Sequence, residues 1–286
     1  MSVLAIPFPN FDPVAISLGP VLGYGPIDIK WYGLAYVAGL ILGWMYIRRL
    51  LATPRLWRHD RPPFAVAKVD DLLLYMTAGV ILGGRLGYVL LWQPETYLAD
   101  PAQILMIHRG GMAFHGALVG TIAAIWLFSR NYGVNLLSTG DLCAAAVPIG
   151  LFFGRVANFI NGELFGRVSD VPWAMVFPDA AKLHSAVEPA TRHPSQLYEA
   201  ALEGLILFLV LRFLTHHRDA LKSPGIVSGV FLAGYGMARI IGEFFREPNA
   251  GHFLNVGPFS AGQFYCVPMV LVGIYLLWRV QKPATA

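Results

Sequence analysis

The sequence predicts an all-α polytopic membrane protein with about seven transmembrane helices, and three observations carry this prediction. Hydrophobic residues make up 56% of the 286 residues and charged residues only 13%, whereas a soluble domain has about 25% charged residues. The mean hydropathy is +0.56. Long apolar runs recur along the chain, and roughly 20 apolar residues cross a hydrocarbon core of about 30 Å as a helix.

Seven windows reach this length and set the order of the expected helices. They cover approximately residues 31–50, 71–92, 112–130, 140–160, 196–214, 225–244 and 261–279. Small residues recur in them at helix-packing intervals, as in Gly79, Gly83 and Gly87. Such spacing allows helices to approach closely in lipid.

The placement of lysine and arginine orients these helices. Of the 21 basic residues, twelve fall on one side of the expected membrane, six on the other and three within spans. Because short cytoplasmic loops collect positive charge, we expect the N-terminus outside and the C-terminus inside. The net charge of +4 reflects this bias and attraction to cytoplasmic lipids, so we expect no nucleic-acid partner.

Two segments outside the spans complete the single domain that we expect over residues 1–286. Residues 1–28 contain several prolines and lack a basic start, so they favour an external arm over a cleaved signal peptide. Residues 163–193 suit a small irregular or short-stranded external cap between the fourth and fifth spans. Cys143 and Cys266 lie in apolar spans and are expected to be small core residues.

The run GRVANFINGELFG, residues 154–166, is the most informative segment of the chain. It ends the fourth span with Arg155, Asn158, Asn161 and Glu163. Arg155 and Asn158 are three residues apart and share a helix face, and Gly162 suits the point where the helix stops. An arginine, two amides and a carboxylate could bind a phosphate. The alternative is an ordinary helix end whose arginine reaches the lipid headgroups, although ionisable residues in membrane segments favour a functional site.

Polar residues from six spans are expected to gather at the outer side of the membrane. Besides the run just described, they are Tyr32, Arg85, His115, His193, Gln196, Glu199, Tyr235, Arg239 and Glu243. Tyr235, Arg239 and Glu243 are spaced by four and so share one helix face. Arg239 and Glu243 could also simply neutralise each other. Glu199 and Glu203 form a like-charged pair on one face, for which we expect an arginine from a neighbouring span.

The histidines leave two alternatives open. His115 could be a hydrogen-bonded core residue, but the glycines around it allow a ligand or a backbone to come close. His193 precedes a proline that suits a first helical turn, so it could belong to a helix cap only. His108 and His115 are seven residues apart without a carboxylate or cysteine that would complete a metal site, so we expect none.

Taken together, these motifs resemble the prolipoprotein diacylglyceryl transferase family of bacterial inner membranes. The segments that carry the resemblance are GRVANFINGELFG, HRGGMAFHG, RHPSQLYE and GYGMARIIGEFFREP. The similarity extends from FDPV at residues 11–14 through the seventh span, and the first segment is highly specific. Ala117 departs from the family pattern, in which a second glycine is expected after His115.

The resemblance implies a transfer reaction in the bacterial inner membrane. A diacylglyceryl group would move from phosphatidylglycerol to the lipobox cysteine thiol of a preprolipoprotein, which is the first step of bacterial lipoprotein maturation. A thioether would form, and glycerol phosphate would leave. The reaction requires no cofactor, because the donor lipid supplies both the transferred group and its leaving group.

The residues found above suit such a reaction, with His115, Arg239, Glu243 and Arg155 as candidate catalytic residues. A cysteine thiol has a pKa near 8.5, so a base must help to form the thiolate; His115 is the first candidate, with Glu243 or Glu163 as alternatives. Arg155 and Arg239 would stabilise the negative charge of the leaving phosphate. The expected phosphatidylglycerol-binding residues are Arg155, Asn158, Asn161, Glu163, Gly166, Tyr235, Tyr32, His193 and Gln196.

Two other classes of protein compete with this interpretation. A secondary transporter or lipid carrier also has buried charges and glycine-rich helices. However, the sequence shows no pair of matching halves, and the polar groups gather at one leaflet only. A seven-span receptor or scaffold would leave that convergence unexplained.

Overall fold

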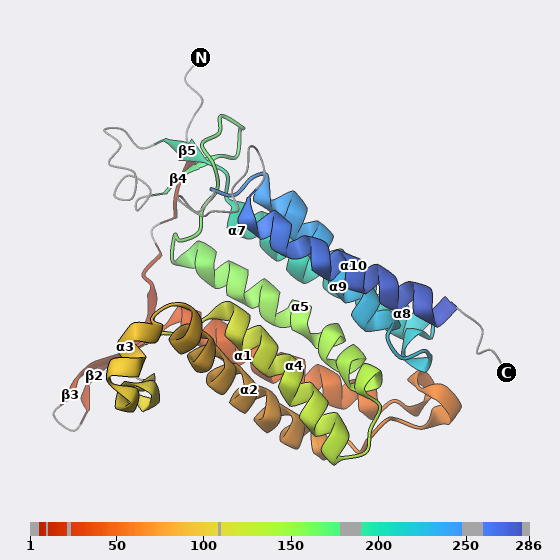
Figure 1. Cartoon of the computed structure of the whole chain (residues 1–286). Coiled ribbons are helices and arrows are strands. Elements are labelled where there is room, and N and C mark those ends of the chain that lie inside the picture. Colours follow the sequence, from red (N-terminus) through yellow and green to blue (C-terminus); the bar gives the residue numbers. More distant parts are fainter. Residues whose placement is uncertain are drawn as a thin grey trace. The chain divides into compact units, whose positions relative to one another are not determined.

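Helices occupy each of the seven apolar windows in the computed structural model, which describes residues 6–9, 11–21, 24–107, 110–177, 190–247 and 260–281. The α-helices are α1 (Trp31–Leu51), α2 (Lys68–Leu91), α3 (Pro94–Ala99), α4 (Phe114–Asn131), α5 (Leu136–Ile160), α7 (Ser195–Glu199), α8 (Leu207–His217), α9 (Ile226–Glu243) and α10 (Ala261–Gln281) (Figure 1). The short 3-10 helices are η1 (Pro54–Leu56), η2 (Arg58–Asp60), η3 (Pro101–Leu105) and η6 (Ala220–Lys222). A π-helical segment, η5 (Ala200–Ile206), joins α7 to α8.

The lengths and compositions of these helices confirm an all-α polytopic membrane protein. The helices α1, α2, α5, α9 and α10 are long and apolar enough to cross a membrane. The window 196–214 is helical too, but the π-helical turn divides it. The number of seven spans and the orientation of the termini stay predictions.

The end of α5 follows the sequence expectation. The helix stops at Ile160, and Gly162 adopts a positive φ of 66°, a conformation that glycine reaches without strain. The backbone N–H of Gly162 donates to the carbonyl of Phe159 at 2.9 Å, and that of Glu163 donates to Asn158 at 3.1 Å. Gly162 therefore turns the chain out of the helix and brings Glu163 back beside it.

The chain divides into two compact units. The first unit comprises Met1–Tyr46 and Cys143–Ala286, and the second comprises Ile47–Leu142. The boundaries fall within α1 and α5. The single domain expected over residues 1–286 stays a prediction.

In the second unit α2 and α4 lie side by side (Figure 1) through facing glycines. A Cβ atom added to Gly83 would lie 2.4 Å from the carbonyl oxygen of Gly116, and one added to Gly120 would lie 2.0 Å from that of Gly79. The two backbones are thus in direct contact. The small-residue spacing that the sequence analysis interpreted as helix packing has this structural role.

The first unit contains two small sheets. Strands β1 (Ile6–Pro7), β4 (Met175–Val176) and β5 (Thr191–Arg192) form one sheet, in which β1 is parallel to β4 and β4 is antiparallel to β5. The second sheet is an antiparallel hairpin of β2 (Val14–Val21) and β3 (Tyr24–Lys30), which leads directly into α1. The expected arm therefore contributes one strand to the segment expected as a cap. The external location of both stays a prediction, and residues 178–189 of the expected cap lie outside the described residues.

We expect Gly120→Ala to lower the free energy of unfolding by roughly 1–3 kcal/mol, the usual cost of overpacking. The added methyl group would lie 2.0 Å from the Gly79 carbonyl oxygen, so α2 and α4 would have to separate. Thermal unfolding in detergent measures the effect. Gly150→Ala in α5 is the matched control, because a Cβ atom there meets nothing within 4 Å; equal midpoints for both variants would contradict the close packing.

Candidate functional site

A cluster of buried charged side chains lies in the first unit, where α5, the α7–η5 segment and α9 meet. The Arg–Glu cluster consists of Arg155, Glu199, Glu203, Arg239, Glu243 and Arg246. Arg155 reaches Glu199 with Nη1 at 3.0 Å and Glu203 with Nη2 at 3.1 Å. Arg239 donates to Glu199 and to Glu243. Glu199 is therefore shared by two arginines from two different helices.

The burial of this cluster is nearly complete. The side chains of Glu199 and Glu203 are 0% exposed, and those of Arg155 and Arg239 are 15% and 12% exposed. A charge in an apolar environment is stable only when an opposite charge and hydrogen bonds compensate for its lost hydration. The three helices are consequently held in the register that keeps these ions paired.

Local sequence explains how the carboxylates reach the arginines. Arg239 and Glu243 are one turn apart on α9, so their pairing follows from helix geometry. Glu203 lies in the π-helical η5, where a Cβ atom on Gly204 would come within 2.7 Å of the Cα atom of Phe152 in α5. Glycine at 204 therefore lets η5 approach α5, which brings Glu203 to Arg155. Single-turn π-helical bulges often occur at functional sites.

The sequence analysis anticipated part of this cluster. An arginine from a neighbouring span was expected to answer the like-charged pair Glu199 and Glu203, and two arginines do so. Neither glutamate was among the expected catalytic or lipid-binding residues. Their spacing of four on one helix face was the signal that marks them.

Arg246 is the least tightly paired member of the Arg–Glu cluster. Its Nη1 atom lies 3.8 Å from Glu199 and 3.9 Å from Glu243, beyond hydrogen-bond length. Burial and the neighbouring Arg239 lower the pKa of the Arg246 guanidinium.

The amides of the GRVANFINGELFG run donate hydrogen bonds to Glu163. Asn158 donates to Glu163 Oε1 at 2.7 Å and Asn161 donates to the same atom at 3.4 Å. Gln196 donates to the backbone oxygen of Glu163 at 2.6 Å. The four polar residues of the run therefore form two adjacent groups, one around Glu163 and the other within the Arg–Glu cluster.

Gly166 and His193 lie together beside the segment that follows α9. The N–H of Gly166 donates to the carbonyl of His193 at 2.9 Å, and a Cβ atom on Gly166 would lie 2.4 Å from the carbonyl oxygen of Phe245. Gly166 thus permits a close approach of three chain segments. His193 Nδ1 lies 3.1 Å from the hydroxyl of Tyr198, and burial lowers the pKa of His193, which favours its neutral form at pH 7.

The two tyrosines expected at the site have different surroundings. Tyr235 is half-buried on α9, one turn before Arg239, with its ring stacked on Phe231 at 5.8 Å. Tyr32 begins α1 and is exposed, with its hydroxyl 3.3 Å from that of Tyr36. The hydroxyl of Tyr32 thus contacts a residue of its own helix, whereas Tyr235 lies on the face of α9 that carries Arg239.

His115 belongs to the second unit, so its expected role beside the arginines stays a prediction. It lies at the start of α4, is exposed, and packs edge to face on Phe114 at 5.7 Å. It also lines a groove of about 810 Å³ that follows α2 and α4. Apart from His115 and Tyr75, the residues that line this groove are aliphatic side chains and glycines.

Arg85, also in the second unit, donates to backbone carbonyl groups and lies over the Tyr97 ring. It is 4% exposed and donates to the carbonyl oxygens of Gln103, Ile104, Gly110 and Gly111 at 2.6–3.1 Å. A Cβ atom on Gly111 would lie 2.8 Å from Arg85 Nη1, and Gly111 has a φ of 84°. Arg85 therefore anchors the segment that leads to His115, and Gly111 makes room for it.

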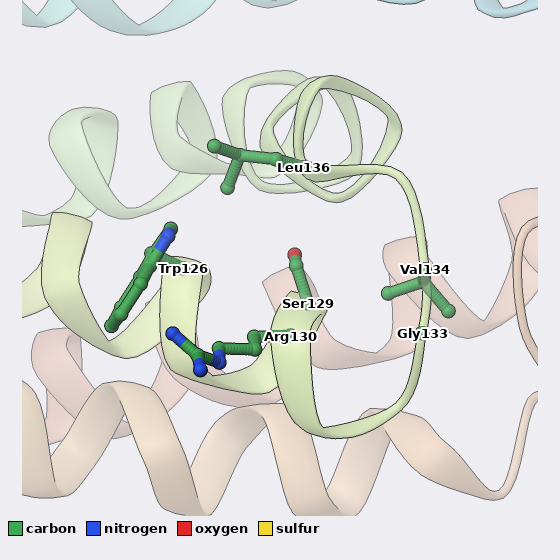
Figure 2. Close-up of a pocket in the computed structure, with 6 residues that line it drawn as sticks. All are labelled: Trp126, Ser129, Arg130, Gly133, Val134 and Leu136. Atoms are coloured by element: carbon green, nitrogen blue, oxygen red, sulfur yellow. The ribbon is translucent and has the colours of Figure 1, made fainter.

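Figure 2 shows a smaller pocket at the connection between α4 and α5, in the second unit. Its volume is about 330 Å³, and it is lined by Trp126, Ser129, Arg130, Gly133, Val134 and Leu136. The Arg130 guanidinium lies over the Trp126 ring at 5.5 Å. We assign this pocket no chemistry. Among the described residues, no group of three His, Cys, Asp or Glu side chains could hold a metal ion.

Apolar helices that suit a membrane and a buried cluster of arginines and glutamates among them define an integral membrane protein with a polar centre. Comparison with known proteins specifies the family. Residues 20–279 match the family described as prolipoprotein diacylglyceryl transferase. The chain therefore belongs to the prolipoprotein diacylglyceryl transferase family and is a transferase, which removes the transporter and scaffold interpretations.

Individual relatives agree along nearly the whole chain. The phosphatidylglycerol–prolipoprotein diacylglyceryl transferase of Rhizobium meliloti (strain 1021) is 48% identical over 282 residues, which cover 98% of this chain and 96% of that protein. The protein of the same name from Paramagnetospirillum magneticum is 51% identical over 286 residues, with 99% and 98% covered. The resemblance inferred from four motifs is thereby confirmed.

We expect Glu199→Gln to lower the free energy of unfolding by roughly 3–5 kcal/mol, the cost of breaking a buried ion pair. Two buried arginines would lose their shared carboxylate. Asp70→Asn is the control, because the Arg48–Asp70 pair has side chains 36% and 58% exposed and such surface pairs contribute about 0–1 kcal/mol. Thermal unfolding of both variants in one detergent measures the difference. Equal losses of unfolding free energy would show that the buried Glu199 contributes no more to stability than the exposed Asp70.

Proposed function

We propose that this chain transfers a diacylglyceryl group from phosphatidylglycerol to the lipobox cysteine thiol of preprolipoproteins in the bacterial inner membrane. The observation that carries the proposal is the pair Arg155 and Arg239, held by the shared carboxylate of Glu199 in a buried site. The family to which the chain belongs supports the reaction class. The names of its relatives support phosphatidylglycerol and a prolipoprotein as substrates.

In the proposed reaction the cysteine sulfur attacks the glyceryl carbon that carries the phosphate ester. A carbon–sulfur bond forms, and the bond from that carbon to the phosphate oxygen breaks. The electron pair leaves with glycerol phosphate, which gains a negative charge, and the thiol proton passes to a base. The enzyme therefore needs a cationic site for the phosphate and a proton acceptor near the sulfur.

Arg155 and Arg239 supply the cationic site. Guanidinium groups fixed in a water-poor pocket stabilise the charge that develops on the leaving phosphate more than the same groups would in water. Tyr235 lies on the same face of α9 as Arg239, and its hydroxyl can donate a hydrogen bond to a phosphate or glycerol oxygen. Glu199 and Glu243 keep the Arg239 guanidinium in one orientation before the lipid arrives.

His115 remains our first candidate for the proton acceptor. Glu243, which accepts from Arg239 and Ser260, and Glu163, which accepts from Asn158 and Asn161, remain the alternatives. His115 is exposed and lies along the apolar groove of α2 and α4. A groove lined by aliphatic residues suits a hydrocarbon chain, which supports a lipid substrate beside this imidazole.

Product chemistry tests the proposed function. Purified protein is mixed with phosphatidylglycerol vesicles and a lipobox peptide that contains one cysteine, and peptide mass and released glycerol phosphate are followed. We expect a diacylglyceryl mass gain matched by glycerol phosphate, and no gain on a peptide with serine in place of cysteine. A folded, lipid-binding preparation that yields neither product would contradict the proposal.

We expect Arg239→Lys to reduce turnover by about 100-fold, comparable to the loss of one donor to a developing oxyanion. A lysine keeps the charge but cannot form the same bidentate contacts. Turnover is measured by glycerol phosphate release. Arg130→Lys is the matched control, since Arg130 stacks on Trp126 in the pocket of Figure 2; if both variants kept full turnover, Arg239 would have no role in charge stabilisation.

We expect His115→Gln to reduce transfer at neutral pH by about 10²–10⁴-fold, the usual contribution of general base catalysis. Raising the assay pH above about 8.5 should restore part of the rate, because the substrate thiol then ionises without a base. A pH–rate profile of wild type and variant measures both effects. His217→Gln, at the end of α8, is the control, and a uniform loss at every pH would assign His115 a different role.

A further inference from the structure

The first turn of α10 contacts the Arg–Glu cluster through a helix cap. Ser260 and Gln263 form a capping box, in which the Ser260 N–H donates to Gln263 Oε1 at 3.0 Å and the Gln263 N–H donates to Ser260 Oγ at 3.4 Å. The same Ser260 hydroxyl donates to Glu243 Oε2 at 2.6 Å. One hydroxyl thus caps α10 and binds a carboxylate of α9.

Gly262 makes this contact possible. A Cβ atom at position 262 would lie 2.8 Å from Glu243 Cδ and 2.8 Å from Oε1, closer than real Cβ contacts. The side chain of Gln263 also donates to the carbonyl of Ile240 at 3.3 Å, which ties the same turn to α9. Ser260 and Gln263 are each 6% exposed. The first turn of α10 is therefore fitted around the carboxylate of Glu243.

The two oxygens of Glu243 have separate partners. Oε2 accepts from Ser260, and Oε1 accepts from Arg239. Because Ser260 fixes one oxygen, the carboxylate cannot rotate freely, and the other oxygen stays directed at the guanidinium. The N-terminus of a helix also favours a negative charge nearby. The orientation of Arg239 therefore depends on the position of α10, because the Glu243 carboxylate contacts both.

We propose that Ser260 and Gly262 are positioning residues for the transfer reaction, which hold Glu243 so that Arg239 is oriented toward the lipid phosphate. The inference rests on the proposed function, since it assigns Arg239 to the phosphate. Neither Ser260 nor Gly262 touches substrate in this account. Their effect passes entirely through Glu243, and this restriction makes the inference testable.

A double-mutant cycle of Ser260→Ala and Glu243→Gln tests that restriction. We expect Ser260→Ala to lower kcat about tenfold, as for a lost hydrogen bond to a charged group, with little change in KM for phosphatidylglycerol. The double variant should be no slower than Glu243→Gln alone, because contacting residues that act through one another are not additive. Multiplied losses in the double variant would overturn the inference.

Two further serine variants separate positioning from folding. Ser260→Thr retains the hydroxyl and should keep most of the turnover that Ser260→Ala loses. Ser129→Ala is the matched control, because Ser129 is a buried serine whose hydroxyl donates to Thr139 in the second unit. Turnover lost equally in Ser260→Ala and Ser129→Ala would indicate a general effect of losing a buried hydroxyl and would contradict the inference.

Gly262→Ala provides an independent test that removes no hydrogen-bonding group. The added methyl group should displace the Glu243 carboxylate and lower kcat. Thermal unfolding of the purified variant should show that it is still folded. Gly43→Ala in α1 is the control, because its Cβ atom would make only an ordinary 3.8 Å contact with Ala146. Wild-type turnover in folded Gly262→Ala would contradict the positioning role.

The two proposals fail in different ways. If the wild-type protein yields no lipidated peptide, the proposed function is wrong, and the coupling of Ser260 with Glu243 is then measured on the unfolding midpoint. If the effects of the Ser260 and Glu243 variants are coupled in the unfolding midpoint but not in turnover, the contact between the two residues is structural only, and a positioning role is excluded. If the wild-type protein is active while Ser260→Ala and Gly262→Ala match it, the positioning role alone is wrong.

Discussion

The sharing of one buried carboxylate, that of Glu199, by Arg155 and Arg239 is the interaction on which the first unit depends. Charges in an apolar environment require partners, because each unpaired ion would cost several kcal/mol. This requirement fixes how α5, α7 and α9 lie against one another, and Gly204 allows the close approach that it demands. The polar site is consequently formed by helix packing before any substrate binds, which is what electrostatic stabilisation of a transition state needs.

Arg85 shows the other way to bury a guanidinium, and the contrast explains why it is unsuited to bind a phosphate. Its donors are directed at four backbone carbonyls, which are fixed by the chain and cannot withdraw. The partners of Arg155 are the side-chain carboxylates of Glu199 and Glu203. A carboxylate can give way to a phosphate by a small rotation, since both are anions of similar bonding geometry. The Arg–Glu cluster can therefore exchange partners, whereas Arg85 serves to anchor a loop.

The sequence predicted those features that depend on local periodicity or on strong backbone preferences. The apolar windows became helices, Gly162 ended α5, and the like-charged pair Glu199 and Glu203 met arginines from neighbouring helices. It could not predict which residues would pair, because Arg155 and Glu203 are 48 residues apart and their contact depends on a π-helical turn. The contact of Ser260 with Glu243 could not be predicted either. A capping box can be recognised in a sequence, but the distant carboxylate that its serine also binds cannot.

Charge balance gives Arg246 a place in the proposed reaction. Within the Arg–Glu cluster three arginines face three glutamates, so their formal charges sum to zero. The phosphate of phosphatidylglycerol adds one negative charge, and the departing glycerol phosphate adds more as its bond to carbon breaks. Arg155 and Arg239 are paired with carboxylates at short range, whereas Arg246, within the described part of the chain, lies 3.8 and 3.9 Å from Glu199 and Glu243. A charge-balanced cluster with one loosely paired arginine suits the proposed reaction, in which the site is stable when empty and must stabilise additional charge when the phosphate leaves.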